Sequence, residues 1–244
     1  MDELKEKLRA WAKEYNTPSF IDSDPIQFPR KYIHSKKDAE ISGILTALIS
    51  YGRREQIIAK AKALDDMFNN NPYFWVMNGR FREDIPYNHK SFYRCIDNAK
   101  MREWCSTIQM MLFTHGSIEQ YIKITFPNQG LHYGLSVTLG FNPTSANKRI
   151  AMFLRWMVRD DGIVDLGLWK DTDSKSLVIP LDIHVLKEAI ALGITQRKTA
   201  DIKTALEITE YMKSLFPDDP LLGDFALFGY GINKDKAIRC REQI

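Results

Sequence analysis

Apolar residues recur at helical spacing along most of the chain. In the first segment, Leu4, Leu8, Trp11 and Tyr15 fall on one stripe. Residues three and four positions apart lie on one face of an α-helix, so this spacing predicts amphipathic helices. We expect further helices over 41–49, 54–68, 101–113, 117–126, 147–159, 185–192, 202–216 and 221–231.

Residues that typically begin or end a helix flank several of these segments. Ser35, followed by Asp38, resembles a capping box, in which side-chain oxygens accept bonds from backbone N–H groups. Gly162 is placed to end the helix that begins near residue 147. Asp219-Pro220 is a typical start for the last helix.

Strand signals are weak. The segment 135–141, LSVTLGF, is the best candidate for a strand, and the chain has no internal repeat, low-complexity tract or linker. The predicted fold class is therefore all-α.

The composition is that of a folded globular protein. The chain has 244 residues, of which 44% are apolar and 27% charged, so it can bury a substantial core. It has no run of about 18 apolar residues, and MDELKEKLRAWAKEY at the N-terminus is not a signal-peptide pattern. We expect a cytoplasmic protein with no membrane partner. The formal net charge of +3 is compatible with a polyanionic partner and does not require one.

Cysteine and histidine residues do not form metal-binding patterns. Cys95, Cys105 and Cys240 lack CxxC spacing and are too few for a four-thiolate zinc or iron–sulfur site, so we interpret them as free thiols. The histidines are scattered, and no P-loop or Gly-x-Ser-x-Gly turn is present. The sequence predicts no metal and no cofactor.

One carboxylate, Asp182, interrupts the apolar run SLVIPLDIHV at 176–185, directly before a helical pattern. An aspartate there can be a helix N-cap, which stabilises a helix by about 0.5–2 kcal/mol. It can also stabilise a positive charge that develops during a reaction. In that case a second group would have to be the nucleophile. Both interpretations remain open at this point, and they are compatible.

Lys148 is a candidate for that second group. It follows the turn-prone NPTSAN at 142–147 and opens the next predicted helix. The helix dipole favours anions over cations at this end and so lowers the affinity of the lysine amine for its proton. A neutral amine is the form that acts as a nucleophile. The alternative is a solvated surface lysine.

These two segments resemble the helix-hairpin-helix (HhH-GPD) DNA glycosylases of the oxoguanine branch. That family has a lysine at the start of one helix, as in NKRIAMFLR (147–155), and a V-P-x-D-x-H element at the start of the next, as in VIPLDIHV (178–185). More weakly, 40–64 is similar to the early helix of the superfamily. The chain is closest to a bacterial group described as a domain of unknown function, through FLRWMVR, GLW, PLDIHV and DFALFGYG.

The resemblance implies one HhH-GPD-like domain over 1–244, with two closely packed helical lobes, about 40–130 and 1–39 plus 131–244, and a cleft between them. It implies a base-excision-repair enzyme that is both DNA glycosylase and abasic-site lyase. Its partner would be double-stranded DNA with an abasic site or an oxidised base such as 8-oxoguanine.

The resemblance also implies residue roles. Lys148 would form a Schiff base with the sugar, and Asp182 would assist it. The candidate base pocket comprises Tyr51, Arg53 and Phe228. The candidate DNA contacts are Ser145, Asn147, Arg149, Arg155 and His184. A packing role is equally open for His184, and a solvated helix face for the row Arg149, Arg155 and Arg159.

Two departures from the family pattern keep other functions open. The hairpin GFNPTSANKR has no glycine between Pro143 and Lys148, and the extra residues 160–175 lengthen the spacing from lysine to aspartate. An archaeal oxoguanine glycosylase branch resembles the chain in both respects. The alternatives are a DNA-binding protein that kept the fold without turnover and an all-α scaffold for a protein partner.

Overall fold

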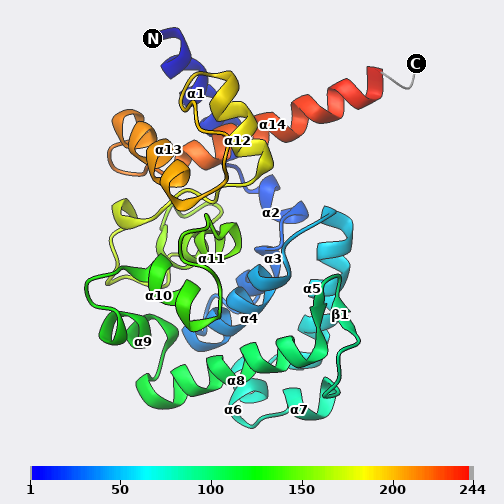
Figure 1. Cartoon of the computed structure of the whole chain (residues 1–244). Helices are drawn as coiled ribbons and strands as arrows, with labels where there is room; N and C mark the ends of the chain where they lie inside the picture. Colours follow the sequence, from blue (N-terminus) through cyan, green and yellow to red (C-terminus); the bar gives the residue numbers. More distant parts are fainter. Residues whose placement is uncertain (1, 242–244) are drawn as a thin grey trace. The chain divides into compact units, whose positions relative to one another are not determined.

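The fold comes from a computed structural model, which describes the backbone of residues 2–241 and the side chains of residues 3–231 and of Lys234 (Figure 1). The chain forms two compact units. Unit 1 comprises Met1–Phe20 and Asn142–Ile244, and unit 2 comprises Ile21–Phe141. The described residues are mostly helical, as the spacing of apolar residues predicts.

Unit 2 contains most of the shorter helices and a small hairpin. Its elements, with α2 crossing from unit 1, are α2 (Ser19–Ser23), α3 (Gln27–Arg30), α4 (Lys36–Ile49), α5 (Arg54–Phe68), α6 (Pro72–Met77), α7 (Phe81–Asp84), β1 (Ser91–Tyr93), β2 (Ile96–Asp97), α8 (Asn98–His115), α9 (Ile118–Thr125) and α10 (Leu131–Thr138).

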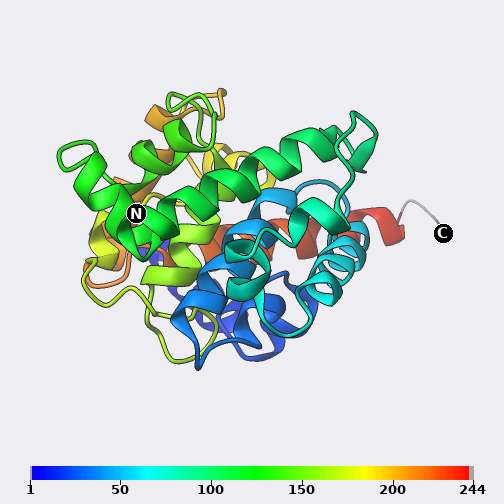
Figure 2. The same cartoon turned by 90° about the horizontal axis from the view of Figure 1, so that it is seen from below.

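Helix α4 forms the core of unit 2. Every residue from Ala39 to Ile49 is buried, because α4 packs against α3, α5 and α6. A helix that is apolar on most sides is stable only in such a position. The long helix α8 runs next to α6 and α9 (Figure 2). Ser35 caps α4, because its hydroxyl oxygen accepts a bond from the backbone N–H of Asp38. The reciprocal half of the expected capping box is not formed, since the backbone N–H of Ser35 donates to the carbonyl of Tyr32.

The prediction of a strand over 135–141 is wrong. Residues Leu131–Thr138 form α10, which packs on α9 and buries Leu135. The hydroxyl groups of Ser136 and Thr138 donate to the carbonyls of His132 and Gly134 one turn earlier, so these residues fit a helix. The only strands in the described chain are β1 and β2, an antiparallel pair joined through Arg94, which has a left-handed backbone (φ +52°).

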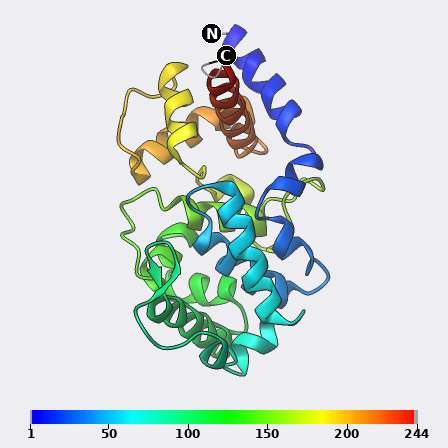
Figure 3. The same cartoon turned by 90° about the vertical axis from the view of Figure 1, so that its right-hand side faces the viewer.

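Unit 1 is built around two helices, α11 (Lys148–Val158) and α14 (Leu222–Arg241). Its other elements are α1 (Asp2–Tyr15), the 3-10 turn η1 (Ser174–Ser176), α12 (Ile183–Ala191) and α13 (Ile202–Leu215). Helix α14 packs against α1, α12 and α13 (Figure 3). Helix α11 is buried from Ile150 to Val158.

Glycines on α14 allow its neighbours to approach closely. A Cβ atom built on Gly229 would lie 2.3 Å from the ring of Tyr15 on α1. One built on Gly231 would lie 3.3 Å from the Cβ of His184 and 3.2 Å from Glu188 on α12. The segment GDFALFGYG therefore sets the distances at which α1 and α12 pack on α14.

Replacing Gly229 by alanine is expected to destabilise the protein. Alanine favours a helix over glycine by about 1 kcal/mol, but overpacking against Tyr15 costs about 1–3 kcal/mol. We expect a lower free energy of unfolding in urea denaturation, with a smaller loss for Gly231→Ala. A gain in stability for Gly229→Ala would contradict this packing.

Two of the residues expected to mark helix boundaries do not do so. Helix α11 ends at Val158 rather than at Gly162. Helix α14 begins at Leu222 rather than after Asp219-Pro220, because the Asp219 carboxylate pairs with Arg159 (2.8 Å) instead of capping the helix.

The unit boundaries also differ from the lobes expected at 40–130. Residues 21–39 belong to unit 2 because α3 packs on α4 and α5, and α10 joins it through α9. None of the described helices is long and apolar enough to span a membrane.

The extra residues 160–175 contribute several buried side chains to the core of unit 1. Val164 and Trp169 are fully buried, and the backbone N–H groups of Leu166 and Trp169 donate to Trp156 and Met157 at the end of α11. Asp161 Oδ1 accepts three backbone N–H bonds, from residues 163 to 165, and fixes the turn. The long spacing between Lys148 and Asp182 therefore results from a segment that folds back over α11.

Candidate functional site

Asp182 is the N-cap of α12, as predicted. Its Oδ1 atom accepts bonds from the backbone N–H groups of His184 (2.9 Å) and Val185 (3.0 Å). The residues before it, 177–181, are buried, so the carboxylate is held on a fixed segment. Its second oxygen, Oδ2, makes no hydrogen bond to the described residues. The cap thus orients the carboxylate and leaves one oxygen for another partner.

Lys148 is the first residue of α11 and is half-buried. The preceding residue, Asn147, has a left-handed backbone (φ +41°), which asparagine tolerates better than most residues. Its side chain donates to the carbonyl of Asn142 (2.8 Å) and closes the turn. This turn fixes the point at which α11 starts and therefore the position of Lys148.

Phe228 lies beside Lys148. The Lys148 Nζ atom is 5.8 Å from the ring centroid of Phe228, on α14. The same ring makes edge contacts with His184 (6.3 Å) and Phe20 (6.4 Å). Of the three residues proposed for a base pocket, Phe228 is therefore next to the proposed nucleophile, and His184 packs against it.

Asp224 is a buried carboxylate near both Lys148 and Asp182. Its side chain, on the first turn of α14, forms an ion pair with Arg155. Burial raises the pKa of Asp224 to about 6; the negative charge of Asp182 also raises it, whereas Arg155 and Lys148 lower it. We refer to Lys148, Asp182, Asp224 and Phe228 as the Lys148 cluster.

Arg155 lies inside unit 1, which corrects its proposed contact with DNA. It is 4% exposed, and its guanidinium pairs with Asp224 and with Asp165 (3.2 Å). Arg159, one turn later, is 1% exposed and pairs with Asp165, Asp161 and Asp219. The arginine row along α11 is therefore internal at these two positions, because residues 160–175 and α14 supply carboxylates that cover it.

The hairpin segment before Lys148 is tied to the start of α13. The carbonyl of Thr144 accepts a bond from Ile202 N (3.0 Å), and Ser145 forms a bridge with Asp201. Ser145, Asn147 and Arg149 are half-buried. Part of the backbone that could contact phosphate in this segment is thus used within unit 1.

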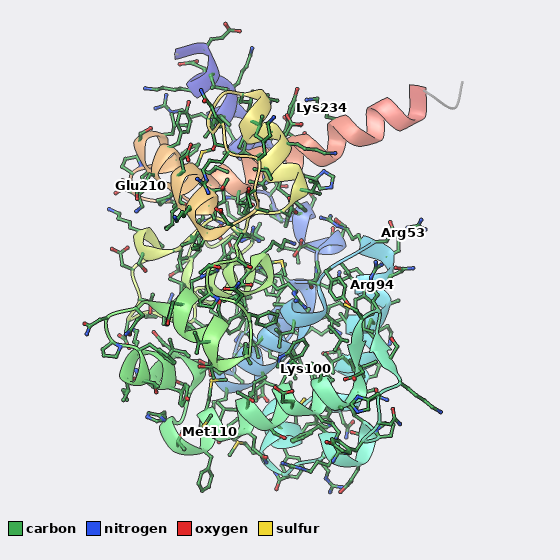
Figure 4. All side chains as sticks on the ribbon, in the orientation of Figure 1. Arg53, Arg94, Lys100, Met110, Glu210 and Lys234 are labelled. Atoms are coloured by element: carbon green, nitrogen blue, oxygen red, sulfur yellow. The ribbon has the colours of Figure 1, made fainter. Side chains whose placement is uncertain are left out.

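Tyr51 and Arg53 belong to unit 2, in contrast to the rest of the candidate site. The Tyr51 hydroxyl donates to the carbonyl of Tyr93 (3.1 Å) and accepts a bond from Cys95 N (3.1 Å). Arg53 is exposed before α5, and Arg94 lies over the Tyr51 ring at 5.5 Å (Figure 4). Tyr51 therefore joins the β hairpin to the end of α4.

An ion pair between a lysine and a glutamate also connects α12 to α14. Lys234, labelled in Figure 4, extends from α14 and pairs with Glu188 of α12 (3.1 Å). Tyr230 stacks on Trp11 of α1 at 3.9 Å. These contacts place α14, which contains Asp224 and Phe228, in a fixed position within unit 1.

Free thiols are present as predicted at two of the three cysteines. Cys95 is exposed and Cys105 is buried, and neither forms a disulfide. The side chain of Cys240 lies outside the described residues. Within the described part of the chain, no group of three or more His, Cys, Asp or Glu side chains is arranged to hold a metal ion.

The chain belongs to the family described as "Protein of unknown function (DUF2400)", which it matches over residues 24–135 and 128–233. No curated protein and no solved structure matches the chain. The matched segments contain all four residues of the Lys148 cluster.

Asp224 is the residue of the cluster that sequence reasoning missed. The signal was present, because Asp224 interrupts the apolar segment LLGDFALFGYG in the same way as Asp182 interrupts SLVIPLDIHV. A carboxylate inside an apolar helix must be paired when it is buried. The partner, Arg155, is too distant in sequence for spacing to indicate the pair.

Proposed function

We propose that unit 1 carries the chemistry of a DNA glycosylase with abasic-site lyase activity, directed at an oxidised base such as 8-oxoguanine. The observation that carries this proposal is the Lys148 cluster: an amine at a helix start, a capping carboxylate with one oxygen available, and an aromatic ring beside the amine. A flipped base requires an aromatic surface, and sugar chemistry requires a nucleophile with a nearby carboxylate.

The proposed reaction uses Lys148 as the nucleophile. Its neutral amine attacks the sugar C1′, the C1′–N bond to the base breaks, and the base leaves with the bonding electrons and accepts a proton. Ring opening gives a Schiff base between Nζ and C1′. Loss of a C2′ proton then breaks the C3′–O bond, which cuts the strand. Asp182 stabilises the positive charge that develops on the sugar.

Asp224 extends this mechanism. Its ionisation responds to the charges of both Lys148 and Asp182, which couples it electrostatically to the other two groups. The ionised form of Asp224 is the active one in this mechanism, because a carboxylate can accept the proton that the Lys148 amine must lose before attack. Arg155 keeps this carboxylate in place.

Replacing Asp182 by asparagine separates the capping role from the chemical role. Asparagine caps helices about as well as aspartate, so stability is expected to change little, whereas loss of the charge slows the reaction about 100-fold or more. Asp201→Asn is a matched control, because Asp201 caps α13 through its carboxylate in the same way. Equal rates for Asp182→Asn and wild type would contradict the chemical role.

The activity is expected to fall at acidic pH because of Asp224. Its pKa of about 6 means that the carboxylate is mostly ionised at pH 7 and mostly protonated at pH 5. Below about pH 6 the rate of Schiff-base formation should fall about tenfold per pH unit. Asp224→Asn should be slow at all pH values and lack this limb. A variant that keeps the limb would show that another group titrates.

The alternative is a DNA-binding protein without turnover. It is motivated by the segment before Lys148, which lacks the glycines that the family has in its hairpin between Pro143 and Lys148. Phosphate contacts by Ser145, Asn147 and Arg149 remain proposals. A salt titration of the affinity for duplex DNA measures these contacts. Each phosphate contact increases the slope of log Kd against the logarithm of the salt concentration.

The proposed function is tested by incubating the wild-type protein with duplexes that contain 8-oxoguanine, an abasic site or no lesion, in the presence of borohydride. We expect a covalent adduct with the abasic duplex and, after base excision, with the 8-oxoguanine duplex, but none with the undamaged duplex. Binding without an adduct on either substrate would favour the alternative.

A further inference from the structure

A cavity of about 570 Å³ opens on unit 2. Its lining comes from α7, the segment before β1 and the first turns of α8, and includes Arg82, Tyr87, Lys100 and Arg102. The volume lies in the range of small-ligand sites, about 300–1,000 Å³. None of these residues takes part in the proposed chemistry of unit 1.

Tyr87 presents an open aromatic surface in this cavity. It is 78% exposed, which is unusual for a large aromatic side chain. The Arg102 guanidinium lies 5.3 Å from its ring centroid, so one side of the ring is supported. An exposed tyrosine ring backed by an arginine can stack on a planar, electron-rich ligand such as a nucleobase.

Two guanidinium groups that line the cavity are held in fixed positions. Arg102 Nη1 donates to the carbonyl of Ile85 (3.1 Å), and Arg82 Nη2 donates to Gln109 Oε1 (3.0 Å). Arg82 also lies 4.3 Å from the ring centroid of Phe81. Neither arginine pairs with a carboxylate of the described chain, so both keep a positive charge in the cavity.

The carboxylates of the cavity have partners of their own. Asp97 pairs with His89 (2.7 Å), and its Oδ1 accepts the backbone N–H of Lys100 (2.7 Å). Glu103 pairs with Lys100 (2.8 Å), which is labelled in Figure 4 on the first turn of α8. The unpaired charge of the cavity is therefore that of the two arginines, whose planar geometry suits phosphate.

We propose that this cavity binds a nucleotide, with its base stacked on Tyr87 and its phosphate bound by Arg82 and Arg102. The base must be unpaired, because stacking on a side chain requires an exposed face. The ligand is therefore a unit of single-stranded nucleic acid or a free nucleotide. This inference goes beyond the proposed function and does not rest on it.

The test uses the full-length protein and a fluorescein-labelled oligothymidylate of about ten nucleotides, a length within the range that one such surface binds. Binding is measured by fluorescence anisotropy for wild type, Tyr87→Ala, Tyr87→Phe and Phe113→Ala. Phe113, on α8, is 82% exposed and lies outside the cavity lining, so it is a matched control. Thermal melting verifies that all variants are folded.

We expect Tyr87→Ala to weaken binding about tenfold, and Tyr87→Phe and Phe113→Ala to bind as wild type does. Competition by thymidine 5′-monophosphate would identify a free nucleotide as the ligand, and competition by unlabelled oligothymidylate alone would identify a strand; either supports the site. Absence of binding by wild type, or equal binding by Tyr87→Ala, would overturn the proposal.

Discussion

Lys148→Gln is expected to abolish the borohydride-trapped adduct with an abasic duplex and to slow base excision about a thousandfold or more. Glutamine has a similar length but no nucleophilic amine, so the bond between Nζ and C1′ cannot form. Losses of this order follow when a nucleophile is removed from a group of residues that act together. The assay is single-turnover excision followed by gel analysis of the adduct.

The control for this variant is Lys187→Gln. Lys187 is an exposed lysine on α12, the helix that Asp182 caps, and removing it changes the net charge by the same amount. We expect wild-type adduct formation for Lys187→Gln and unchanged binding of duplex DNA for both variants. Equal adduct yields for Lys148→Gln and wild type would show that another amine is the nucleophile.

Arg155→Leu is expected to have the largest effect on stability. Leucine removes the positive charge that pairs with Asp165 and Asp224, both of which are 3% exposed. Breaking a buried ion pair on one side typically costs about 3–5 kcal/mol, because a buried charge loses its partner. At about 2–4 °C per kcal/mol for a protein of this size, Tm should fall by about 10 °C.

The matched control is Arg197→Leu. Arg197 pairs with Asp201 (2.7 Å), but its side chain is 38% exposed, so this pair contributes about 1 kcal/mol or less. Thermal and urea denaturation measure both variants. A loss below about 1 kcal/mol for Arg155→Leu would mean that the two carboxylates are not held as buried charges in the native protein.

The parts of the fold that depend on local pattern could be predicted from the sequence. The caps at Ser35 and Asp182 and the start of α11 near Lys148 follow from residues adjacent in the chain. The helix over 131–138 was missed because Val137 and Thr138 favour strands locally, whereas contact with α9 stabilises a helix. The β1–β2 hairpin was missed because strands of three and two residues are too short to show an alternating pattern of apolar and polar residues.

Residues of the candidate site were predictable only where they are local to a helix start. Spacing along α11 gives the direction in which Arg155 points, but it does not reveal that residues 160–175 fold back and supply Asp165 as its partner. Asp224 is part of the Lys148 cluster because α14 packs against α12, a contact between segments about forty residues apart. Such a contact has no signature in a single sequence.

The central claim is that the Lys148 amine forms the covalent bond with the sugar, and peptide mapping of the trapped adduct tests it most directly. Reduction fixes the sugar on Nζ and blocks trypsin after Lys148, so the modified peptide should span residues 124–149. Mass spectrometry that finds the sugar on this peptide, at Lys148, is the predicted result. A sugar on any other lysine, or on the N-terminal amine, would contradict the account.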